Sequence, residues 1–228
     1  MTTNVYIDGF NLYYGAVRGT SNKWLDLEAL CHRLLPGDDI RRIRYFTARV
    51  SARSGDPRQP QRQQTYLRAL ESLPMVSVHY GHFLTHTVRM PLANPKPGAP
   101  ATAEVLKTEE KGSDVNLASH LLLDAFRKDC DVAVVISNDS DLRVPIRIAE
   151  QQLGVTVGII NPHHPKNRSR VLKGTFFNSS DDQCPHNASC RTSSQTPTEP
   201  SGSRKVGDPQ YAEARRSGPR TQPPKRLG

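Results

Sequence analysis

Strand-like and helix-like segments alternate along residues 1–178, and this alternation constrains the fold more than any other feature of the sequence. Five segments have the apolar or alternating pattern of strands: residues 4–7, 40–48, 75–83, 132–136 and 155–160. Helical patterns separate them at residues 11–17, 25–35, 59–72, 113–128 and 142–152. Strands that alternate with helices indicate crossover connections, so we expect an α/β fold with a mostly parallel sheet of about five strands.

Two further segments do not fit a repeating strand–helix pattern. Residues 91–100 contain four prolines, which predicts a loop, and residues 104–109 are expected to form a short extended piece. Beyond residue 178 the chain is rich in Ser, Pro, Gly, Arg and Gln and has almost no large apolar side chains. Such a segment buries too little apolar surface to offset the entropy lost on ordering. We therefore predict a domain at residues 1–178 and a disordered Ser/Pro/Arg-rich tail at 179–228.

The charge of the chain favours a polyanionic partner. The sequence has 31 Lys and Arg against 22 Asp and Glu, a formal charge of +9. Eight arginines lie between Arg41 and Arg68, where Asp56 is the single acid. Because arginine forks suit phosphate groups, we predict that Arg49, Arg53 and Arg58 form a track for RNA. A basic protein that is merely soluble is the alternative. Among the aromatic residues of this span, we expect Tyr45, Phe46 and Tyr66 to lie mostly in the core.

Several classes of protein are disfavoured by the sequence. The N-terminus has no charged segment followed by an apolar one, and no apolar run approaches the roughly 18–20 residues that span a bilayer. We therefore expect a cytoplasmic protein without a membrane partner. A nucleotide cofactor is not expected, because the first strand is followed by Asp8-Gly9-Phe10-Asn11 and not by a glycine-rich phosphate turn. A haloacid-dehalogenase-type phosphatase would need a second Asp where Phe10 stands.

Acidic residues stand where the predicted sheet would bind a ligand. Asp8 follows the first strand, and Asp139 and Asp141 follow the strand at 132–136. In open α/β sheets, ligands bind beyond the carboxyl ends of the strands. Ser113 is expected to be an N-cap, which places Asp114 in the first turn of a crossover helix at the same edge. We therefore expect Asp8, Asp114 and Asp139 to lie together.

Carboxylates crowded in this way repel one another unless a cation lies between them. Oxygen ligands without Cys or His suit Mg²⁺ or Mn²⁺, and such an ion assists phosphodiester cleavage by activating water and offsetting phosphate charge. Each acid also has a purely structural interpretation. Asp114 matches the helix dipole, Asp8 could form a turn before Gly9, and Asp139 or Asp141 could cap the helix that begins at Leu142, with Asp141 the better match.

Three motifs resemble those of the NYN domain family, a group of PIN-like nucleases that includes the LabA-like bacterial proteins. They are VYIDGFNLY at residues 5–13, EEKGSDVNLA at 109–118 and VISNDSDL at 135–142. The segments 154–162 and 169–177 are also similar to the end of that domain, so the resemblance covers about residues 3–178. It implies a three-layer, Rossmann-like α/β/α (PIN-like) fold and a metal-dependent ribonuclease, expected to be an endonuclease.

The resemblance also assigns roles to single residues. It implies that Asp8, Asp114 and Asp139 bind Mg²⁺ or Mn²⁺, and that Asp141 supports them or a second ion. Asn11 would orient a ligand or the phosphate, Ser137 would hydrogen-bond a carboxylate or phosphate, and Lys111 would contact the substrate. Many relatives carry an Asp where this chain has His120, which puts a second tightly held metal in doubt. The alternative is an RNA-binding module that kept the fold and lost turnover. The sequence leaves open a homo-oligomer or a separate specificity partner.

Overall fold

A computed structural model describes residues 1–52, 55–96, 98, 100–172 and 176–178. The predicted tail, residues 179–228, lies outside the described residues. Among those described, a seven-stranded sheet has the order β4-β3-β2-β1-β5-β6-β7. Its strands are β1 (Thr2–Asp8), β2 (Asp39–Ala48), β3 (Val76–Pro91), β4 (Thr102–Lys111), β5 (Val132–Ile136), β6 (Thr156–Ile160) and β7 (Phe176–Asn178). No helix in this part of the chain is both long and apolar enough to cross a membrane.

The five predicted strands are all present, but the expected number of about five was too low. The additional strands are β4, which contains the extended piece predicted at 104–109, and the three-residue β7. All neighbouring strands are parallel except β3 and β4, which are antiparallel. The sheet is therefore mostly parallel, as the alternation of strands and helices predicted.

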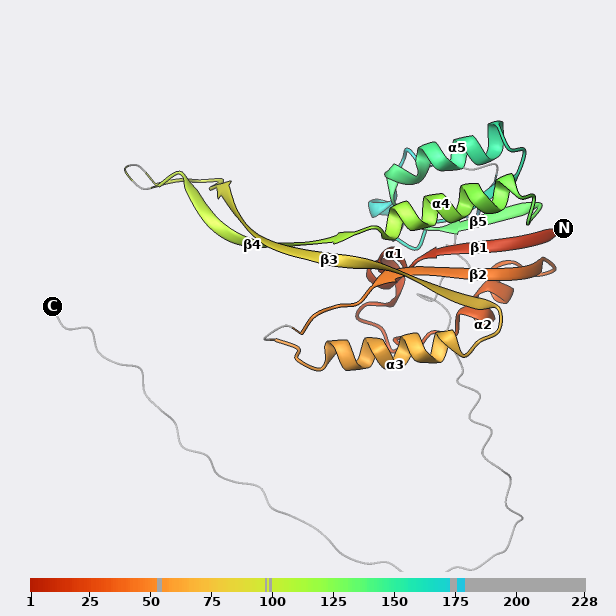
Figure 1. Ribbon diagram of the computed structural model, residues 1–228, viewed down its shortest axis with the longest axis horizontal. Coiled ribbons are helices and arrows are strands. Elements are labelled where there is room, and N and C mark those ends of the chain that lie inside the picture. Colours follow the sequence, from red (N-terminus) through yellow and green to blue (C-terminus); the bar gives the residue numbers. More distant parts are fainter. Residues whose placement is uncertain (53–54, 97, 99, 173–175, 179–228) are drawn as a thin grey trace, which may run out of the picture. The chain divides into compact units, whose positions relative to one another are not determined.

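Helical segments connect the strands at most crossovers. They are α1 (Gly9–Leu12), the π-helix η1 (Tyr13–Val17), α2 (Leu27–Leu34), α3 (Gln59–Glu71), α4 (Ser113–Phe126), the 3₁₀ turn η2 (Ser140–Leu142), α5 (Arg143–Gln151) and the 3₁₀ turn η3 (Pro165–Asn167). The helices α2 and α3 cover one face of the sheet, and α4 and α5 cover the other (Figure 1).

Two apolar clusters fill the space between the sheet and these helices. Because successive side chains of a strand point to opposite faces, Val5 and Ile7 enter one cluster and Tyr6 enters the other. The first cluster includes Leu30 of α2 and Leu67 of α3. The second contains Leu117, Leu121 and Ala125 of α4 with Ile146 of α5. Both faces of the sheet are thus buried, which explains the near-continuous apolar strands.

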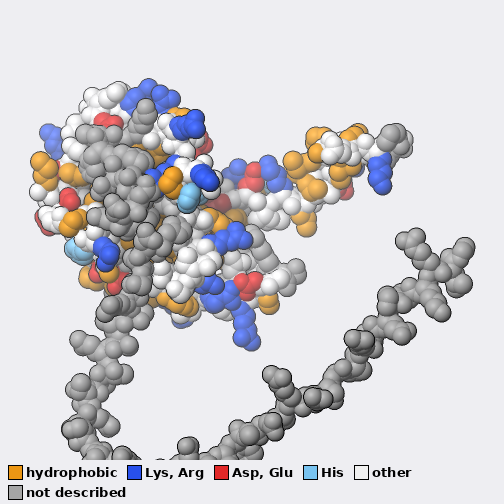
Figure 2. Space-filling view, turned by 180° about the vertical axis from the view of Figure 1, so that it is seen from behind, with side chains coloured by type: hydrophobic (Ala, Val, Ile, Leu, Met, Phe, Trp, Pro, Cys, Tyr) orange, Lys and Arg blue, Asp and Glu red, His pale blue; other side chains and the backbone are white. Residues whose placement is uncertain are grey.

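The strands β3 and β4 form a long hairpin that extends beyond the helices (Figure 1). Its ladder runs from His82 opposite Lys111 to Pro91 opposite Thr102. The predicted strand at 75–83 therefore continues to Pro91, the first residue of the segment predicted as a loop. Directly after the ladder, the N–H of Leu92 donates to the Ala101 carbonyl at 2.9 Å. Hydrophobic side chains are exposed along this hairpin, among them Leu84 and Leu106 (Figure 2). Without a covering helix, the hairpin lacks the buried pattern that revealed the other strands.

A buried ion pair ties α4 to the centre of the sheet. Arg44 of β2 donates from Nε to Asp124 Oδ2 at 2.8 Å and from Nη2 to Asp124 Oδ1 at 2.9 Å. The hydroxyl of Tyr6 on β1 donates to the same Oδ2 at 2.8 Å. The Asp124 side chain is 1% exposed, so its charge needs compensation, which comes mainly from Arg44 and also from Arg42, whose Nη1 lies 3.9 Å from Asp124 Oδ1.

We predict that Asp124→Asn destabilises the fold by about 3 kcal/mol, because it leaves the Arg44 guanidinium buried without a counter-charge. The matched control is Glu104→Gln in the exposed pair with Arg89, for which the expected loss is about 0–1 kcal/mol. Urea unfolding of both variants measures the difference. Equal losses in the two variants would contradict the importance of the buried pair.

Candidate functional site

The carboxyl ends of β1 and β5 bring the first and third sequence motifs together. These strands are parallel neighbours, and Ile7 lies opposite Ile136 in their register. Asp8 is the last residue of β1, and Ser137 is the residue directly after β5. The hydroxyl of Ser137 donates to Asp8 Oδ2 at 3.0 Å, although the two residues are 129 positions apart. The edge of the sheet where a ligand was expected is therefore built around Asp8.

Asp8 is fixed by hydrogen bonds at both carboxylate oxygens. Its Oδ1 accepts from the backbone N–H groups of Phe10 and Asn11 at 3.1 and 3.0 Å, which caps α1. Its Oδ2 accepts from Asn11 Nδ2 at 2.5 Å in addition to Ser137. Burial raises the pKa of Asp8, hydrogen bonds from Asn11 and Ser137 oppose that change, and the charge of Asp139 adds to it. The structural and functional interpretations of Asp8 are thus compatible, since one carboxylate caps a helix at the candidate site.

Asp139 is placed in the turn after β5. Its backbone N–H donates to Ser137 Oγ at 3.0 Å, and its carboxylate accepts from the N–H of Asp141 at 2.9 Å. Asp139 is therefore the N-cap of η2. The expectation that Asp141 is the better N-cap was wrong, because the helical segment begins two residues before Leu142, with the 3₁₀ turn at Ser140. Asp141 instead lies in the first turn of η2 and is exposed.

Asp114 lies in the first turn of α4 and faces the other acids. Burial raises its pKa to about 7, with further contributions from Asp8, Asp139, Glu110 and Asp141 in that order. The predicted N-cap was wrong by one residue. Gly112 occupies that position with φ 95°, a left-handed conformation that favours glycine, and Ser113 is the first helical residue.

Glu110 is an acid at this site that the residue-by-residue sequence analysis missed. It lies near the end of β4, and its Oε1 accepts from the N–H and hydroxyl of Ser113 at 3.1 and 2.7 Å. The opposite strand approaches closely here, since a Cβ added to Gly81 would lie 2.6 Å from the Lys111 carbonyl oxygen. The sequence does contain the pair Glu109-Glu110 before Lys111-Gly112. The pairing of β4 with β3 is what shows that Glu110 lies at this site.

Three asparagines hold the turn after β5 in place. The backbone N–H of Asn138 donates to Asn11 Oδ1 at 3.3 Å, and Asn138 Oδ1 accepts from Asn161 Nδ2 at 2.6 Å. The same oxygen accepts from the N–H of Ser169 at 2.6 Å. Asn138 and Asn161 were not assigned a role from the sequence, although Asn138 lies two residues after β5 and Asn161 directly follows β6. Their contacts fix the position of the segment that carries Asp139.

The acids suit Mg²⁺ or Mn²⁺ in ligand type, since all their donor atoms are oxygens. Across the described residues, however, no three side chains among His, Cys, Asp and Glu are already gathered closely enough to hold a metal ion. Asp8 also accepts four hydrogen bonds, so its coordination of an ion would require at least one of them to be exchanged. Burial is the largest cause of the raised pKa of Asp114, and the charges of Asp8, Asp139, Glu110 and Asp141 add to it, so these acids repel one another.

The predicted substrate-binding residues occupy three places. Lys111 ends β4, where its Nζ lies 3.3 Å from Glu109 Oε2. Arg49 directly follows β2, and its guanidinium carbon lies 4.9 Å from the centre of the Tyr80 ring. Arg58 is exposed at the start of α3. Arg53 lies outside the described residues.

His120 packs over the sheet. Its ring centre lies 4.1 Å from that of His79 and 5.8 Å from that of Phe46. Burial lowers the pKa of His120, with Arg44 the next contributor. His120 therefore lies on the face of α4 that packs against the sheet.

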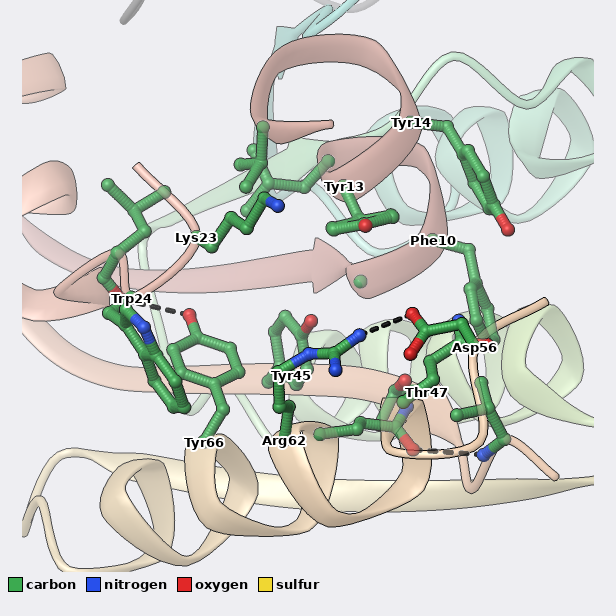
Figure 3. Close-up of a pocket in the computed structure, with 17 residues that line it drawn as sticks. Phe10, Tyr13, Tyr14, Lys23, Trp24, Tyr45, Thr47, Asp56, Arg62 and Tyr66 are labelled. Carbon is green, nitrogen blue, oxygen red and sulfur yellow. Dashed lines mark hydrogen bonds and ion pairs between the residues drawn. The ribbon is translucent and has the colours of Figure 1, made fainter. Parts of the chain in front are cut away.

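A pocket of about 230 Å³ opens between α1 and α3 (Figure 3). It is lined by residues of α1 and η1, of the segment before α2, of the end of β2 and of α3. Gly9, the residue after Asp8, forms part of its wall. The aromatic side chains that line it are Phe10, Tyr13, Tyr14, Trp24, Tyr45 and Tyr66.

Comparison with known proteins gives three findings. The model of the NYN domain matches residues 2–178. The 6-hydroxy-3-succinoylpyridine 3-monooxygenase HspA of Pseudomonas putida is 33% identical over 194 residues, which cover 74% of this chain and 62% of that protein. A crystal structure of a protein of unknown function from Vibrio parahaemolyticus covers 80% of this chain and 94% of that chain, with 17% identity and a TM-score of 0.49.

We predict that Asp114→Asn stabilises the metal-free protein at pH 8. Because the pKa of Asp114 is raised from 3.8 to about 7, the folded state binds its proton more tightly than the unfolded state does. Wild-type stability therefore falls as the pH rises from about 4 to 7, and the variant lacks that loss. After allowance for solvent screening, we expect a gain of about 1–2 kcal/mol at pH 8 and little difference at pH 4.

The measurement is urea unfolding in EDTA at pH 4 and pH 8. Asp39→Asn, at the opposite end of the sheet, is the matched control and should show no such pH-dependent gain. A variant that is less stable than wild type at pH 8 would show that burial and the neighbouring acids do not raise the pKa of Asp114.

Proposed function

This chain belongs to the NYN domain family, and from that premise we propose that it is a metal-dependent ribonuclease that hydrolyses RNA phosphodiester bonds. NYN domains are nuclease-like. We propose further that the substrate is RNA, that a metal ion is required and that cleavage is endonucleolytic. The three-layer PIN-like arrangement of the fold is also a proposal. The observation that carries the proposal is the mutual effect of Asp8, Asp114 and Asp139 at the carboxyl edge of the sheet. Acids held against one another in this way favour a divalent cation.

In the proposed reaction, Asp8, Asp114 and Asp139 would hold Mg²⁺ or Mn²⁺. The cation, when bound, supplies Lewis-acid activation of water and offsets negative charge on the phosphate. Asn11 and Ser137 position the Asp8 carboxylate through their hydrogen bonds. Near neutral pH, the raised pKa of Asp114 lets this carboxyl take up or release a proton as the charge beside it changes. Asp141 and Glu110 add negative charge at the rim of the same site.

We propose that Arg49 and Arg58 guide the RNA backbone towards the acids, together with Lys111 and with Arg53. Arg49 and Arg58 are exposed, and guanidinium groups bind phosphates through two donors at once. Arg49 also follows β2 directly, so it lies at the edge of the sheet that carries Asp8. This placement and the formal charge of +9 support RNA as the substrate.

Two other functions remain as alternatives. The first is an RNA-binding module without turnover, for which RNA affinity would be indifferent to Mg²⁺. The second is an enzyme acting on a small aromatic compound, as the name of the Pseudomonas putida relative states for that protein. The aromatic pocket between α1 and α3 favours this second candidate. It ranks below the ribonuclease because this chain spans only 62% of that relative.

We predict that the purified protein cleaves a labelled, structured RNA in Mn²⁺ or Mg²⁺ and that EDTA abolishes cleavage. Asp8→Asn and Asp139→Asn should each reduce the rate by at least about a hundredfold, because each removes a charged ligand of the proposed metal. Asp39→Asn should cleave at the wild-type rate, since Asp39 begins β2 at the opposite edge. Gel analysis of the products also distinguishes internal from terminal cuts.

Arg49→Ala and Arg58→Ala test the RNA track in the same assay. They should weaken RNA binding and flatten its dependence on salt, while the metal requirement of the residual cleavage stays unchanged. Trace cleavage of the same size in wild type, Asp8→Asn and Asp139→Asn would instead indicate a contaminating nuclease and favour the binding module.

A further inference from the structure

The pocket between α1 and α3 presents ring faces that are already arranged before any ligand binds. The ring centres of Tyr45 and Tyr66 are 6.4 Å apart with their planes at 87°, and those of Trp24 and Tyr66 are 6.2 Å apart at 69°. Tyr66 is held by its hydroxyl, which donates to the Leu25 carbonyl at 2.8 Å. Tyr45 is 7% exposed. The inner wall is therefore a rigid aromatic surface and not a collection of mobile side chains.

The outer rim of the pocket is aromatic but exposed to solvent. Trp24 is 59% exposed, Tyr14 is 48% exposed and Tyr13 is 36% exposed. Large apolar groups gathered at the mouth of a pocket are typical of a binding surface. Aromatic rings that present their faces to solvent are the platforms on which single-stranded nucleic acids stack their bases.

Two positively charged side chains lie beside these rings. Lys23 and Arg62 line the pocket from opposite sides, Lys23 from the segment before α2 and Arg62 from α3 (Figure 3). Arg62 is paired with Asp56. Lys23 takes part in no ion pair within the described part of the chain, so its charge is available to a ligand. The combination suits a planar ring that carries an anionic group such as phosphate.

The size and surroundings of the pocket restrict the ligand further. A volume of about 230 Å³ is below the roughly 300–1,000 Å³ of pockets for drug-sized ligands, so a single base fits it better than a dinucleotide does. Val50 and Gln59 also line it, and these residues directly follow Arg49 and Arg58 in sequence. The lining therefore includes the sequence neighbours of Arg49 and Arg58 and, at Gly9, the neighbour of Asp8.

Gly9 connects the acidic site to the pocket in sequence. Gly9 lines the pocket and follows Asp8, and a Cβ added to Gly9 would lie 2.6 Å from both Cζ and Oη of Tyr45. A ring bound against Tyr45 would therefore lie close to the carboxyl end of β1.

We propose that this pocket binds the base of one unpaired nucleotide of the RNA substrate, stacked on Trp24 with its edge against Tyr66, and with its phosphate bound by Lys23. The proposal rests on the proposed ribonuclease function and adds a subsite to it: the pocket holds one nucleotide beside the bond that is cut. It follows that the enzyme prefers an unpaired base at that position, since a base within a duplex is stacked on its neighbours and cannot enter.

Trp24 is the only tryptophan of the chain, so its fluorescence reports on the pocket directly. We would titrate the full chain in EDTA with AMP, adenosine and inorganic phosphate, each alone. The expected result is saturable quenching by AMP, weaker binding of adenosine and none of phosphate. Lys23→Ala should reduce AMP binding to the level of adenosine, and Tyr66→Leu should weaken both by about tenfold or more. Phe126→Ala, at the exposed end of α4, is the matched control and should bind AMP as wild type does.

Two results would overturn the proposal. The first is quenching that rises linearly without saturation, or that Lys23→Ala and Tyr66→Leu both leave unchanged. The second is a hydroxypyridine carboxylate that binds far more tightly than AMP, which would make the pocket a site for a small aromatic compound. Asp8→Asn separates this proposal from the ribonuclease proposal: it should lose cleavage and keep AMP quenching. If the wild type shows AMP quenching but no RNA cleavage, only the proposed ribonuclease activity is contradicted.

Discussion

Repulsion among the acids at the carboxyl edge of the sheet is the constraint on which the candidate site depends. Asp8, Asp114 and Asp139 come from three separate parts of the chain, and burial together with the charges of the neighbouring acids raises the pKa of Asp114 to about 7. The fold maintains this unfavourable arrangement by rigid means. Asp8 is fixed by four hydrogen bonds, the Asp139 turn is held by Asn138, and α4 is tied to the sheet by the Arg44–Asp124 pair. A site that stores repulsion in a rigid frame is preorganised for positive charge.

Much of this arrangement could be predicted from the sequence because it follows from strand periodicity. Residues 4–7 and 132–136 are buried on both faces, so their apolar runs are unmistakable, and parallel strands necessarily bring Asp8 and Ser137 to one edge. The full length of β3 and β4 could not be predicted in the same way. No helix covers the distal part of this hairpin, so its residues do not show the apolar pattern of a buried strand. That failure concealed Glu110, and it also concealed Gly112, whose left-handed conformation follows from the return of β4 towards α4.

The aromatic pocket illustrates a different limit. Tyr45 and Tyr66 were expected in the core, and Tyr45 is indeed almost fully buried, as is Phe46. Burial does not distinguish a residue of the core from one that forms the floor of a pocket, because both have apolar neighbours. The pocket is evident only when Trp24, Lys23 and Gly9 are seen to line the same space as these rings. The chemistry of such a pocket, more than the fold around it, separates an RNA substrate from a small aromatic one.

The central claim is that the acids form a site for one divalent cation, and calorimetric titration with Mn²⁺ at pH 7 tests it most directly. The account predicts saturable binding that releases protons, because Asp114 is partly protonated at that pH, with heat that depends on the ionisation enthalpy of the buffer. Asp139→Asn should lose binding, and Asp39→Asn should keep it. Absence of saturable binding, or binding that Asp139→Asn leaves intact, would contradict the account.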